Sequence, residues 1–362
     1  MSTHPKLPNK AVRNVPNTAL SFSKLPFPYK HGLLLLPEGR MRLSEKESTI
    51  LAAAELRADA SMALLRKESG YREHTVRYAL KRLTERKVIT PVPFINLHRL
   101  GLTIYTLFFS IGAEKKGTRE GVLKSLMNSP DVLWVGEFGG EYHYGIGFCA
   151  KHISPLVEYL NKLSSKHSTF FFDKAIAIQI SSTIFPRKYL SSKKFSVKPL
   201  TVTYTKEIVK IDETDARILS GLTTYSELSH RQLAMKLKIP LSTLELRVKK
   251  LRENQVIAGN VFIAEPGYFQ MQAFKLLVFT KGLNMELTGE LFKFCSQHRN
   301  ITYLIDCIGT WGYEIGVEVE RPEEVTNIIQ EIYEAFTGSI NTIKVLTKFR
   351  YPKVRWFPGM SD

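Results

Sequence analysis

The chain has 362 residues, of which 44% are hydrophobic and 23% charged, so it should fold into at least two soluble domains. Its formal net charge of +17 favours a polyanionic partner, nucleic acid first and an acidic membrane surface second. Cys149, Cys295 and Cys307 are odd in number and lack C-x-x-C spacing, so neither a disulfide framework nor a metal site is indicated. No apolar run approaches the ~20 residues that a membrane helix needs. We therefore expect a cytoplasmic protein with no membrane partner.

Helical patterns begin after residue 40, behind an arm that lacks hydrophobic periodicity. Residues 1–40 carry scattered prolines and cations, which predicts an extended or disordered segment. Three amphipathic stretches follow, and a β-branched stretch comes after them. Residues 41–98 are therefore predicted to form a winged helix-turn-helix domain. Its helices are expected to begin at Ser44, at Ser61 and near Arg72, and its strand and wing to cover Val88 to Ile95.

Residues 99–186 alternate strand-like and helix-like patterns. The strand-like stretches are rich in β-branched and aromatic residues, and the helix-like ones have apolar residues at helical spacing. Their order, βαββαβ, is that of a ferredoxin-like α/β sandwich. The expected strands cover 102–111, 132–138, 144–149 and 170–180, and the expected helices cover 119–128 and 154–163.

The same order of patterns returns after a basic linker at residues 187–209. Alignment of the two halves without a gap places Leu43 on Ile211, and one inserted residue then places Gly140 on Gly309. We therefore predict an α+β fold, a tandem duplication of a winged helix-turn-helix domain followed by a ferredoxin-like sandwich. The second winged helix-turn-helix is expected over 210–266, the second sandwich over 267–350, and a C-terminal tail over 351–362.

A basic amphipathic helix is predicted over residues 242–253, directly after a short helix and a turn. Ser242 and Glu245 match the capping-box pattern of a helix start. The stretch from Arg72 to Arg86 repeats the arrangement in the first half. A cationic face backed by a buried stripe, in this position and in both halves, favours insertion into nucleic acid over a merely solvated surface. The residues of the apolar stripe are Leu244, Val248 and Leu251.

Both halves resemble the Lrp/AsnC, or feast/famine, family of prokaryotic transcription regulators. In the second half the resembling stretches are 211–219, 228–234 and 247–251, followed by 256–259. The first half is more diverged but keeps the outline from Thr75 to Leu83. The resemblance implies, in each half, a winged helix-turn-helix and a ligand-sensing, oligomerising α/β domain of the RAM type. Ordinary members carry one copy per chain, so two copies in one chain depart from the family pattern.

The resemblance and the helical faces together assign the expected DNA contacts. In a helix-turn-helix the second helix reads base edges in the major groove, while flanking cations hold phosphates. Arg247 lies beside the apolar stripe and is expected to brace the fold instead. The expected groove-facing residues are His74, Tyr78, Lys81, Arg82, Ser242, Thr243, Leu246 and Lys249, and the expected phosphate contacts are Arg77, Arg86, Lys250 and Arg252.

The two cationic faces are chemically unlike, because Tyr78 and Lys81 stand in one half where Leu246 and Lys249 stand in the other. We therefore predict a nucleoid-associated transcription regulator that binds double-stranded DNA at two unequal half-sites. Its two halves would form an intramolecular pseudo-dimer whose α/β domains pair through their sheets. Alternatively, one half contacts DNA and the other serves packing. Further association into a homo-oligomer is left open.

Each half also carries a glycine-aromatic turn where the resembled family has its amino-acid effector pocket. His143 and Gly312 replace the aspartate of the family pattern, so a free amino acid is not the expected ligand. Glycine and aromatic residues in a β-turn are also ordinary structural features. A small-molecule effector is left open, and no cofactor or metal is expected. The residues of the two turns are Gly140, Tyr142 and Tyr144, and Gly309, Trp311 and Tyr313.

Two other functions are weighed against transcription regulation. Siroheme decarboxylases resemble these regulators, work as paired copies and hold a polycarboxylate tetrapyrrole with histidines and a basic pocket. The His-Asn-Tyr and Asn-x-Trp-Phe patterns of those enzymes are missing here, so we expect no enzyme activity. A non-DNA-binding assembly subunit is the third interpretation, and it predicts nucleic-acid affinity that does not change with salt. The histidines near the two α/β domains are His143, His152, His167 and His298.

Overall fold

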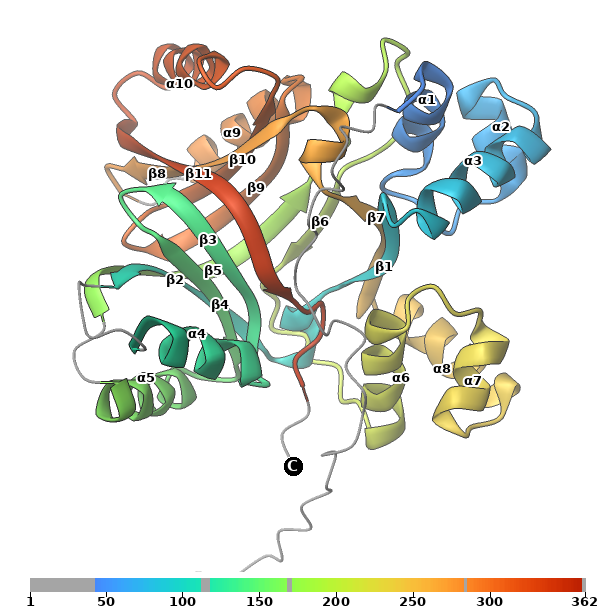
Figure 1. Cartoon of the computed structure of the whole chain (residues 1–362), viewed down its shortest axis with the longest axis horizontal. Helices are drawn as coiled ribbons and strands as arrows, with labels where there is room; N and C mark the ends of the chain where they lie inside the picture. The colour runs from blue at the N-terminus through green and yellow to red at the C-terminus, as the bar shows by residue number, and fades with distance from the viewer. Residues whose placement is uncertain (1–42, 112–117, 168–170, 283–284, 360–362) are drawn as a thin grey trace, which may run out of the picture.

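The computed structural model describes residues 43–111, 118–167, 171–282 and 285–359, and its helices and strands follow one order twice (Figure 1). The predicted arm at 1–40 lies outside the described residues. The first half contains α1 (Glu45–Ala54), α2 (Met62–Ser69), α3 (Glu73–Glu85), β1 (Ile89–Ile95), η1 (Leu97–Leu100), β2 (Thr103–Ile111), α4 (Thr118–Asn128), β3 (Val132–Gly140), β4 (Tyr144–Ala150), α5 (Ser154–His167) and β5 (Phe171–Ile184). The predicted linker contains η2 (Lys188–Leu190) and β6 (Leu200–Thr203). The second half contains α6 (Glu213–Thr224), α7 (His230–Leu237), α8 (Leu241–Glu253), β7 (Ile257–Ala264), η3 (Pro266–Phe269), β8 (Gln272–Thr280), α9 (Met285–Gln297), β9 (Ile301–Gly309), β10 (Tyr313–Val319), α10 (Glu324–Ala335) and β11 (Ile340–Val354).

The helices of the helix-turn-helix units differ in how their N-termini are capped. At α1, the Ser44 hydroxyl accepts a bond from the Glu47 backbone N–H, and the Glu47 carboxylate accepts from the Ser44 N–H, which is a complete capping box. The capping box predicted at Ser242 is wrong. Helix α8 begins at Leu241, and its N-cap is Pro240, which makes no side-chain bond. Because proline fixes φ near the helical value, the helix starts without a capping side chain, and Ser242 already lies in its first turn.

The strands of the two α/β parts join into one antiparallel sheet that closes on itself. Within each half the strand order is that of a ferredoxin-like sandwich, β5-β2-β4-β3 and β11-β8-β10-β9. Strand β3 then pairs with β11, and β9 pairs with β5, so that eight strands form a closed barrel. Strand β6 is not part of the barrel and pairs with residues 181–184 at the end of β5. The predicted pairing of the α/β parts through their sheets therefore takes the form of one shared barrel, in which each half covers both sheet edges of the other.

A glycine stands at each of the two seams where the halves meet. Gly140 at the end of β3 has φ +116°, and a Cβ there would lie 2.7 Å from the Val345 carbonyl oxygen of β11. Gly309 at the end of β9 has φ +149°, and a Cβ there would lie 2.4 Å from the Ile176 carbonyl oxygen of β5. Both positions combine a backbone conformation that favours glycine with a close backbone approach. The two seam glycines are thus required by the closure of the barrel.

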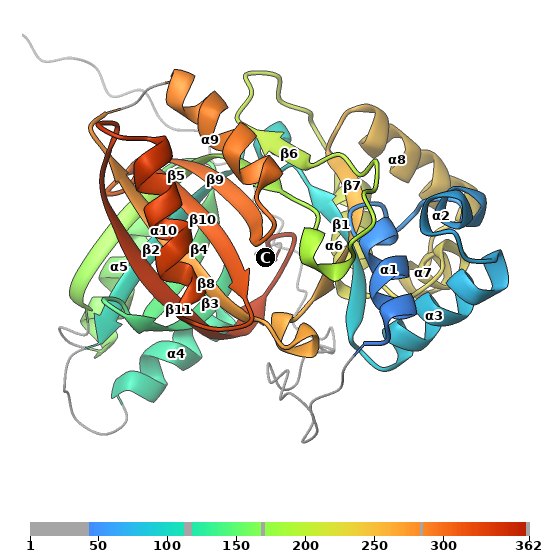
Figure 2. The ribbon, with the colours of Figure 1, turned by 90° about the horizontal axis from the view of Figure 1, so that it is seen from above.

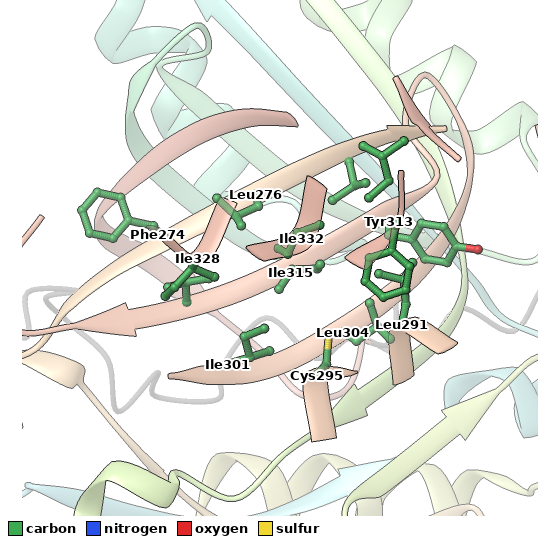
Figure 3. Close-up of a cluster of buried hydrophobic side chains, with 14 of the residues drawn as sticks. Phe274, Leu276, Leu291, Cys295, Ile301, Leu304, Tyr313, Ile315, Ile328 and Ile332 are labelled. Atoms are coloured by element: carbon green, nitrogen blue, oxygen red, sulfur yellow. The ribbon is translucent and has the colours of Figure 1, made fainter. Parts of the chain in front are cut away.

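Helices cover the outer face of the barrel on opposite sides, α4 and α5 over the first half and α9 and α10 over the second (Figure 1). Figure 3 shows one of these outer cores, in which Leu276 and Ile315 of the sheet meet Leu291 and Ile332 of the helices. The inner face is filled by a separate and largely aromatic cluster, which we call the barrel interior. Its fully buried members are Phe108, Phe138, Tyr142, Ala175, Ala177, Leu277, Cys307, Trp311 and Leu346.

The two helix-turn-helix units lie together on one side of the barrel (Figures 1 and 2), and they exchange strands. Strands β1 and β7 pair with each other in antiparallel register. Ile95 and Leu97 thereby enter the core of α6, α7 and α8, while Phe262 enters the core of α1, α2 and α3. The predicted wings are therefore wrong. Each strand ends beneath the other unit, where its apolar side chains are buried more fully than a local hairpin would allow.

The predicted linker and tail are both packed against the barrel and the helix-turn-helix units. Strand β6 pairs with β5, and the Val209 N–H donates to the Arg99 carbonyl oxygen over 2.6 Å. Strand β11 runs on to Val354, where the Lys353 ammonium donates to the Leu126 and Ser129 carbonyl oxygens near the end of α4. Phe357 then joins the core of α6, α7 and α8. These contacts tie the helix-turn-helix units to the barrel.

Candidate functional site

The helices α3 and α8 turn their predicted contact residues to solvent. On α3, Tyr78 is 67% exposed and the Lys81 side chain is 71% exposed. On α8, Leu246 is 54% exposed and the Lys249 side chain is 73% exposed. Neither the tyrosine nor the leucine belongs to a core, so both side chains are accessible to a partner. The other predicted contacts are half-buried at Thr243 and exposed at His74, Arg77, Arg82, Arg86, Ser242, Lys250 and Arg252.

The two exposed lysines make only loose ion pairs within their own helices. The Lys81 ammonium lies 3.7 Å from the Glu85 carboxylate, and the Lys249 ammonium lies 3.8 Å from the Glu253 carboxylate. Solvent-exposed pairs of this kind contribute about 0–1 kcal/mol. Both ammonium groups can therefore exchange their carboxylate for a phosphate at little cost.

Arg247 braces the second helix-turn-helix unit, as predicted. Its guanidinium donates to Asp212 over 2.5 Å and to Asp215 over 3.2 Å. Asp212 and Asp215 themselves form the capping box that starts α6. The arginine thereby joins the middle of α8 to the first turn of α6. The charge of the guanidinium is therefore neutralised by carboxylates of the same unit and is not available for contact with a partner.

Arg252 is held by the other helix-turn-helix unit, which the sequence did not predict. Its guanidinium lies 3.1 Å from the carboxylate of Asp59, in the loop between α1 and α2. The Asn260 side-chain amide of β7 donates to the same carboxylate over 2.8 Å. The gap-free alignment of the two halves places Arg252 on Thr84 and Asp59 on Glu227, so the reciprocal pair does not exist. The contact is therefore one-sided.

The aromatic residues of the two glycine turns are buried and belong to two different cores in each half. Tyr142 and Trp311 are 3% and 1% exposed and lie in the barrel interior. Tyr144 and Tyr313 pack on the outer face, where the Tyr313 hydroxyl lies 2.7 Å from the Thr288 hydroxyl of α9. The turns therefore place one ring on each side of the barrel wall. The four rings form part of the folded cores and do not share an open surface.

The barrel interior encloses an ion pair that sequence reasoning missed. The Lys275 ammonium of β8 bonds the Glu314 carboxylate of β10, and the two side chains are 5% and 0% exposed. The ammonium also lies 5.5 Å from the centre of the Phe108 ring and 5.7 Å from that of the Trp134 ring. Burial opposes its charge, but the Glu314 carboxylate together with the Tyr303 and Tyr351 side chains raises the pKa of Lys275 well above its ordinary value.

Only the second half supplies this pair. When Gly140 is aligned with Gly309, the equivalents of Lys275 and Glu314 in the first half are Thr106 and Gly145. The Phe108 ring lies over Gly145, where a Cβ would come within 2.6 Å of it. The first half therefore has small or uncharged residues where the second half has the ion pair, so the two halves are not interchangeable in the barrel interior.

A second buried charge network joins the first helix-turn-helix unit to the barrel. The Arg187 guanidinium bonds Glu55 at the end of α1, the Ala264 carbonyl oxygen at 3.2 Å, and Glu318 of β10 at 2.8 Å. Tyr189 donates its hydroxyl proton to Glu318 as well. Burial raises the pKa of Glu55. At Glu318 burial also opposes the charged form, but the charge and bonds of Arg187 together with the Tyr189 bond lower the pKa. This network connects three separate parts of the fold.

A pocket of about 410 Å³ opens beside this network, between α1, η2, η3 and the end of β10. Tyr189 and Phe269 are among its lining residues, and its charged lining residues are Glu45 and Glu320. Two carboxylates in the lining disfavour a polyanionic ligand. In the barrel interior, Lys275 is already neutralised by Glu314. Neither place, as built from these residues, fits a polycarboxylate tetrapyrrole.

Metal-ligand clusters and membrane-spanning helices are both absent from the described ranges. No three or more His, Cys, Asp or Glu side chains gather there as metal ligands, and none of the helices there is long and apolar enough to cross a bilayer. The three cysteines are buried, and burial raises the pKa of Cys149 and Cys295 to about 12. These thiols therefore stay protonated, and nucleophilic chemistry at them is disfavoured.

Comparison with known proteins gives matches over about a third of the chain and a structural match over most of it. No protein-family model matches the chain. An uncharacterized HTH-type transcriptional regulator of Pyrococcus furiosus is 24% identical over 124 residues, which cover 34% of this chain and 82% of the relative. LrpC of B. subtilis matches 38% of this chain and 94% of its own at 19% identity, with a TM-score of 0.32. The crystal structure of the siroheme decarboxylase NirDL matches 87% of this chain and 94% of its own at 13% identity, with a TM-score of 0.55.

The match to NirDL corrects two sequence-based expectations. NirDL shares the overall fold of this chain and is an enzyme, and it has also been solved with an iron-uroporphyrin III analogue. The expectations of no enzyme activity and of no cofactor are therefore wrong as inferences from the sequence, because the same fold carries a tetrapyrrole enzyme. They rested on missing sequence patterns, and short patterns do not report on a shared fold when so few residues are identical. The partial match to an HTH-type regulator supports a relation to regulators over about a third of the chain.

Proposed function

We propose that the protein is a sequence-specific regulator that binds double-stranded DNA through α3 and α8. The observation that carries this proposal is the pair of exposed, cationic helix faces, held in one body by the exchanged strands β1 and β7. A helix-turn-helix places its second helix in the major groove, and a fixed spacing between two such helices selects the spacing of the half-sites. The formal net charge of +17 adds attraction to any duplex.

The two units are proposed to read unlike half-sites within one chain. Tyr78 and Leu246 stand at equivalent positions, so one face offers an aromatic hydroxyl and the other an aliphatic side chain. This supports an asymmetric operator rather than a palindrome. Footprinting should show both halves of the site protected by a single chain. A palindrome with each half protected by a separate chain would contradict this part of the proposal.

Replacing Lys249 and Lys250 with alanine should weaken DNA binding and flatten its dependence on salt. Each phosphate contact contributes about −0.9 to the slope of log K against log salt, so the slope should become shallower by about 1–2. The measurement is a salt titration of affinity by fluorescence anisotropy. A matched control removes Lys162 and Lys166, two exposed lysines of α5 on the outside of the barrel. If both variants lost the same amount of DNA affinity, the effect would come from net charge alone and not from α8. If the affinity of the parent chain did not change with salt, the result would favour a non-DNA-binding assembly subunit.

A second candidate function is an enzyme that acts on a tetrapyrrole, as NirDL does. The match over 87% of the chain favours it, although the pocket beside α1 and the barrel interior do not fit a polycarboxylate. Titration of the protein with siroheme separates the two proposals. A substrate of this kind bound in a specific site should shift the absorbance bands of siroheme and saturate at one equivalent per site. An unchanged spectrum at micromolar protein would remove the second candidate.

A further inference from the structure

The contact between Asp59 and Arg252 links the first helix-turn-helix unit to the proposed recognition helix of the second. Arg252 lies in the last turn of α8, and its side chain is 44% exposed. Asp59 is equally exposed and lies 3.1 Å from it. Asn260 holds this loop by two hydrogen bonds. Its side-chain amide donates to the Asp59 carboxylate, and its backbone oxygen accepts from the N–H of the preceding residue, Ala58, over 2.8 Å. The carboxylate is therefore held in place by β7.

The charge of Arg252 is partly neutralised by the Asp59 carboxylate. An exposed ion pair contributes only about 0–1 kcal/mol, so a phosphate that approached Arg252 could displace Asp59. Displacement leaves the Asp59 carboxylate facing the same phosphate without its cation. The net gain from such a phosphate contact is therefore reduced by the acid that stays behind.

We propose that Asp59 is a built-in competitor for phosphate at Arg252, and that it lowers the affinity of this chain for duplex DNA of any sequence. This inference rests on the proposed DNA-binding function and deepens it. Phosphate contacts carry no sequence information, so an acid that weakens one of them lowers non-specific binding and leaves base recognition intact. Only the recognition helix of the second unit has such a competitor, because the residues equivalent to Arg252 and Asp59 are Thr84 and Glu227, which cannot form an ion pair.

Replacing Asp59 with asparagine tests the proposal with little risk to the fold. The asparagine side-chain oxygen can still accept the bond from Asn260, while its charge is gone. Binding to duplexes of random sequence should tighten about threefold or more at low salt, and the slope of log K against log salt should steepen by about 0.9, the value for one added phosphate contact. The probes are labelled random duplexes and a selected operator, titrated at several salt concentrations.

Two further variants make the result specific to Arg252. Glu227→Gln is the matched control, since Glu227 is exposed at the equivalent position of the second half and has threonine, not arginine, at its partner position. It should leave the slope unchanged. Arg252→Ala should weaken binding in the parent chain, because it leaves the Asp59 carboxylate without its cation, and it should abolish the gain of Asp59→Asn when the two are combined.

The outcomes separate this inference from the proposed function. If the parent chain binds duplex DNA but Asp59→Asn matches it in affinity and slope, the competitor is overturned and the regulator stands. An equal gain from Glu227→Gln also overturns it, because the effect is then one of net charge. A parent chain with no salt-dependent DNA binding overturns the proposed function and the competitor with it.

Discussion

Replacing Lys275 with methionine should lower the free energy of unfolding by roughly 3–5 kcal/mol, the usual effect of breaking a buried ion pair from one side. Glu314 is 0% exposed, and its carboxylate would remain in the barrel interior without a cation. The uncharged groups nearby, among them the Tyr303 side chain and the Cys307 thiol, cannot replace the positive charge of the ammonium. Methionine fills a similar volume, so the lost charge dominates the effect. Urea or thermal unfolding measures the change.

Removing the charge of Glu314 as well should recover most of the lost free energy of unfolding. In Lys275→Met combined with Glu314→Leu, neither charge is buried, and replacement of both partners by apolar groups is often neutral or stabilising. The control is Lys344→Met, which breaks the half-exposed pair of Lys344 with Glu141 and should cost about 1 kcal/mol or less. If Lys275→Met and Lys344→Met proved equally mild, the barrel interior would not be the low-dielectric environment that the structure indicates.

Replacing Arg187 with methionine should have a comparable effect, again roughly 3–5 kcal/mol, and should reverse a pH dependence. Glu55 and Glu318 would then be buried close together without their shared cation. In the parent chain the pKa of Glu318 is lowered, so its contribution is present above the ordinary value of 4.5 and is lost as pH falls through the lowered pKa. Without Arg187, burial raises the pKa of Glu318 and raises the pKa of Glu55 further than in the parent chain. The variant should therefore regain stability as pH falls from 8 towards 5.

The control for Arg187 is Arg350, whose guanidinium bonds Glu137 over 2.8 Å at the barrel surface. Arg350→Met should cost about 1 kcal/mol or less and should show no rescue by acid. Unfolding midpoints of the parent and both variants across pH 5–8 test the prediction. A deficit in Arg187→Met that stayed constant over this range would contradict the buried position of the two carboxylates.

The sequence predicted the order of elements well, because that order depends on local patterns. Periodicity located the helices of both units and the βαββαβ order of both α/β parts, with most boundaries within a few residues. The exchange of β1 and β7 was not predictable in this way. Val92 and Phe262 look the same in a local hairpin and in a pairing between units, since only the apolar alternation is encoded locally.

The charged interior escaped sequence reasoning for a related reason. In β8, Phe274, Leu276 and Val278 face the outer core, which leaves Lys275 and Leu277 on the other face of the sheet. A ferredoxin-like sheet standing alone would expose that face, and a lysine there looks ordinary. Only the closure of the barrel converts it into a buried position. One signal could have been used: Leu277 and Phe279 make this second face apolar as well, which is unusual for a solvated sheet.

The two seams also determine when the molecule can be completed during synthesis. Strand β3 ends at Gly140, but its partner β11 begins at Ile340, so the pairing joins segments from opposite halves of the chain. Such distant pairings slow folding, and an unpaired strand edge invites association with other chains. Until β11 leaves the ribosome, the β3 edge of the first half stays open, whereas the β5 edge already has β6 and β9 as partners. The barrel can therefore close only when β11 has been made, and until then the β3 edge remains open to association with other chains.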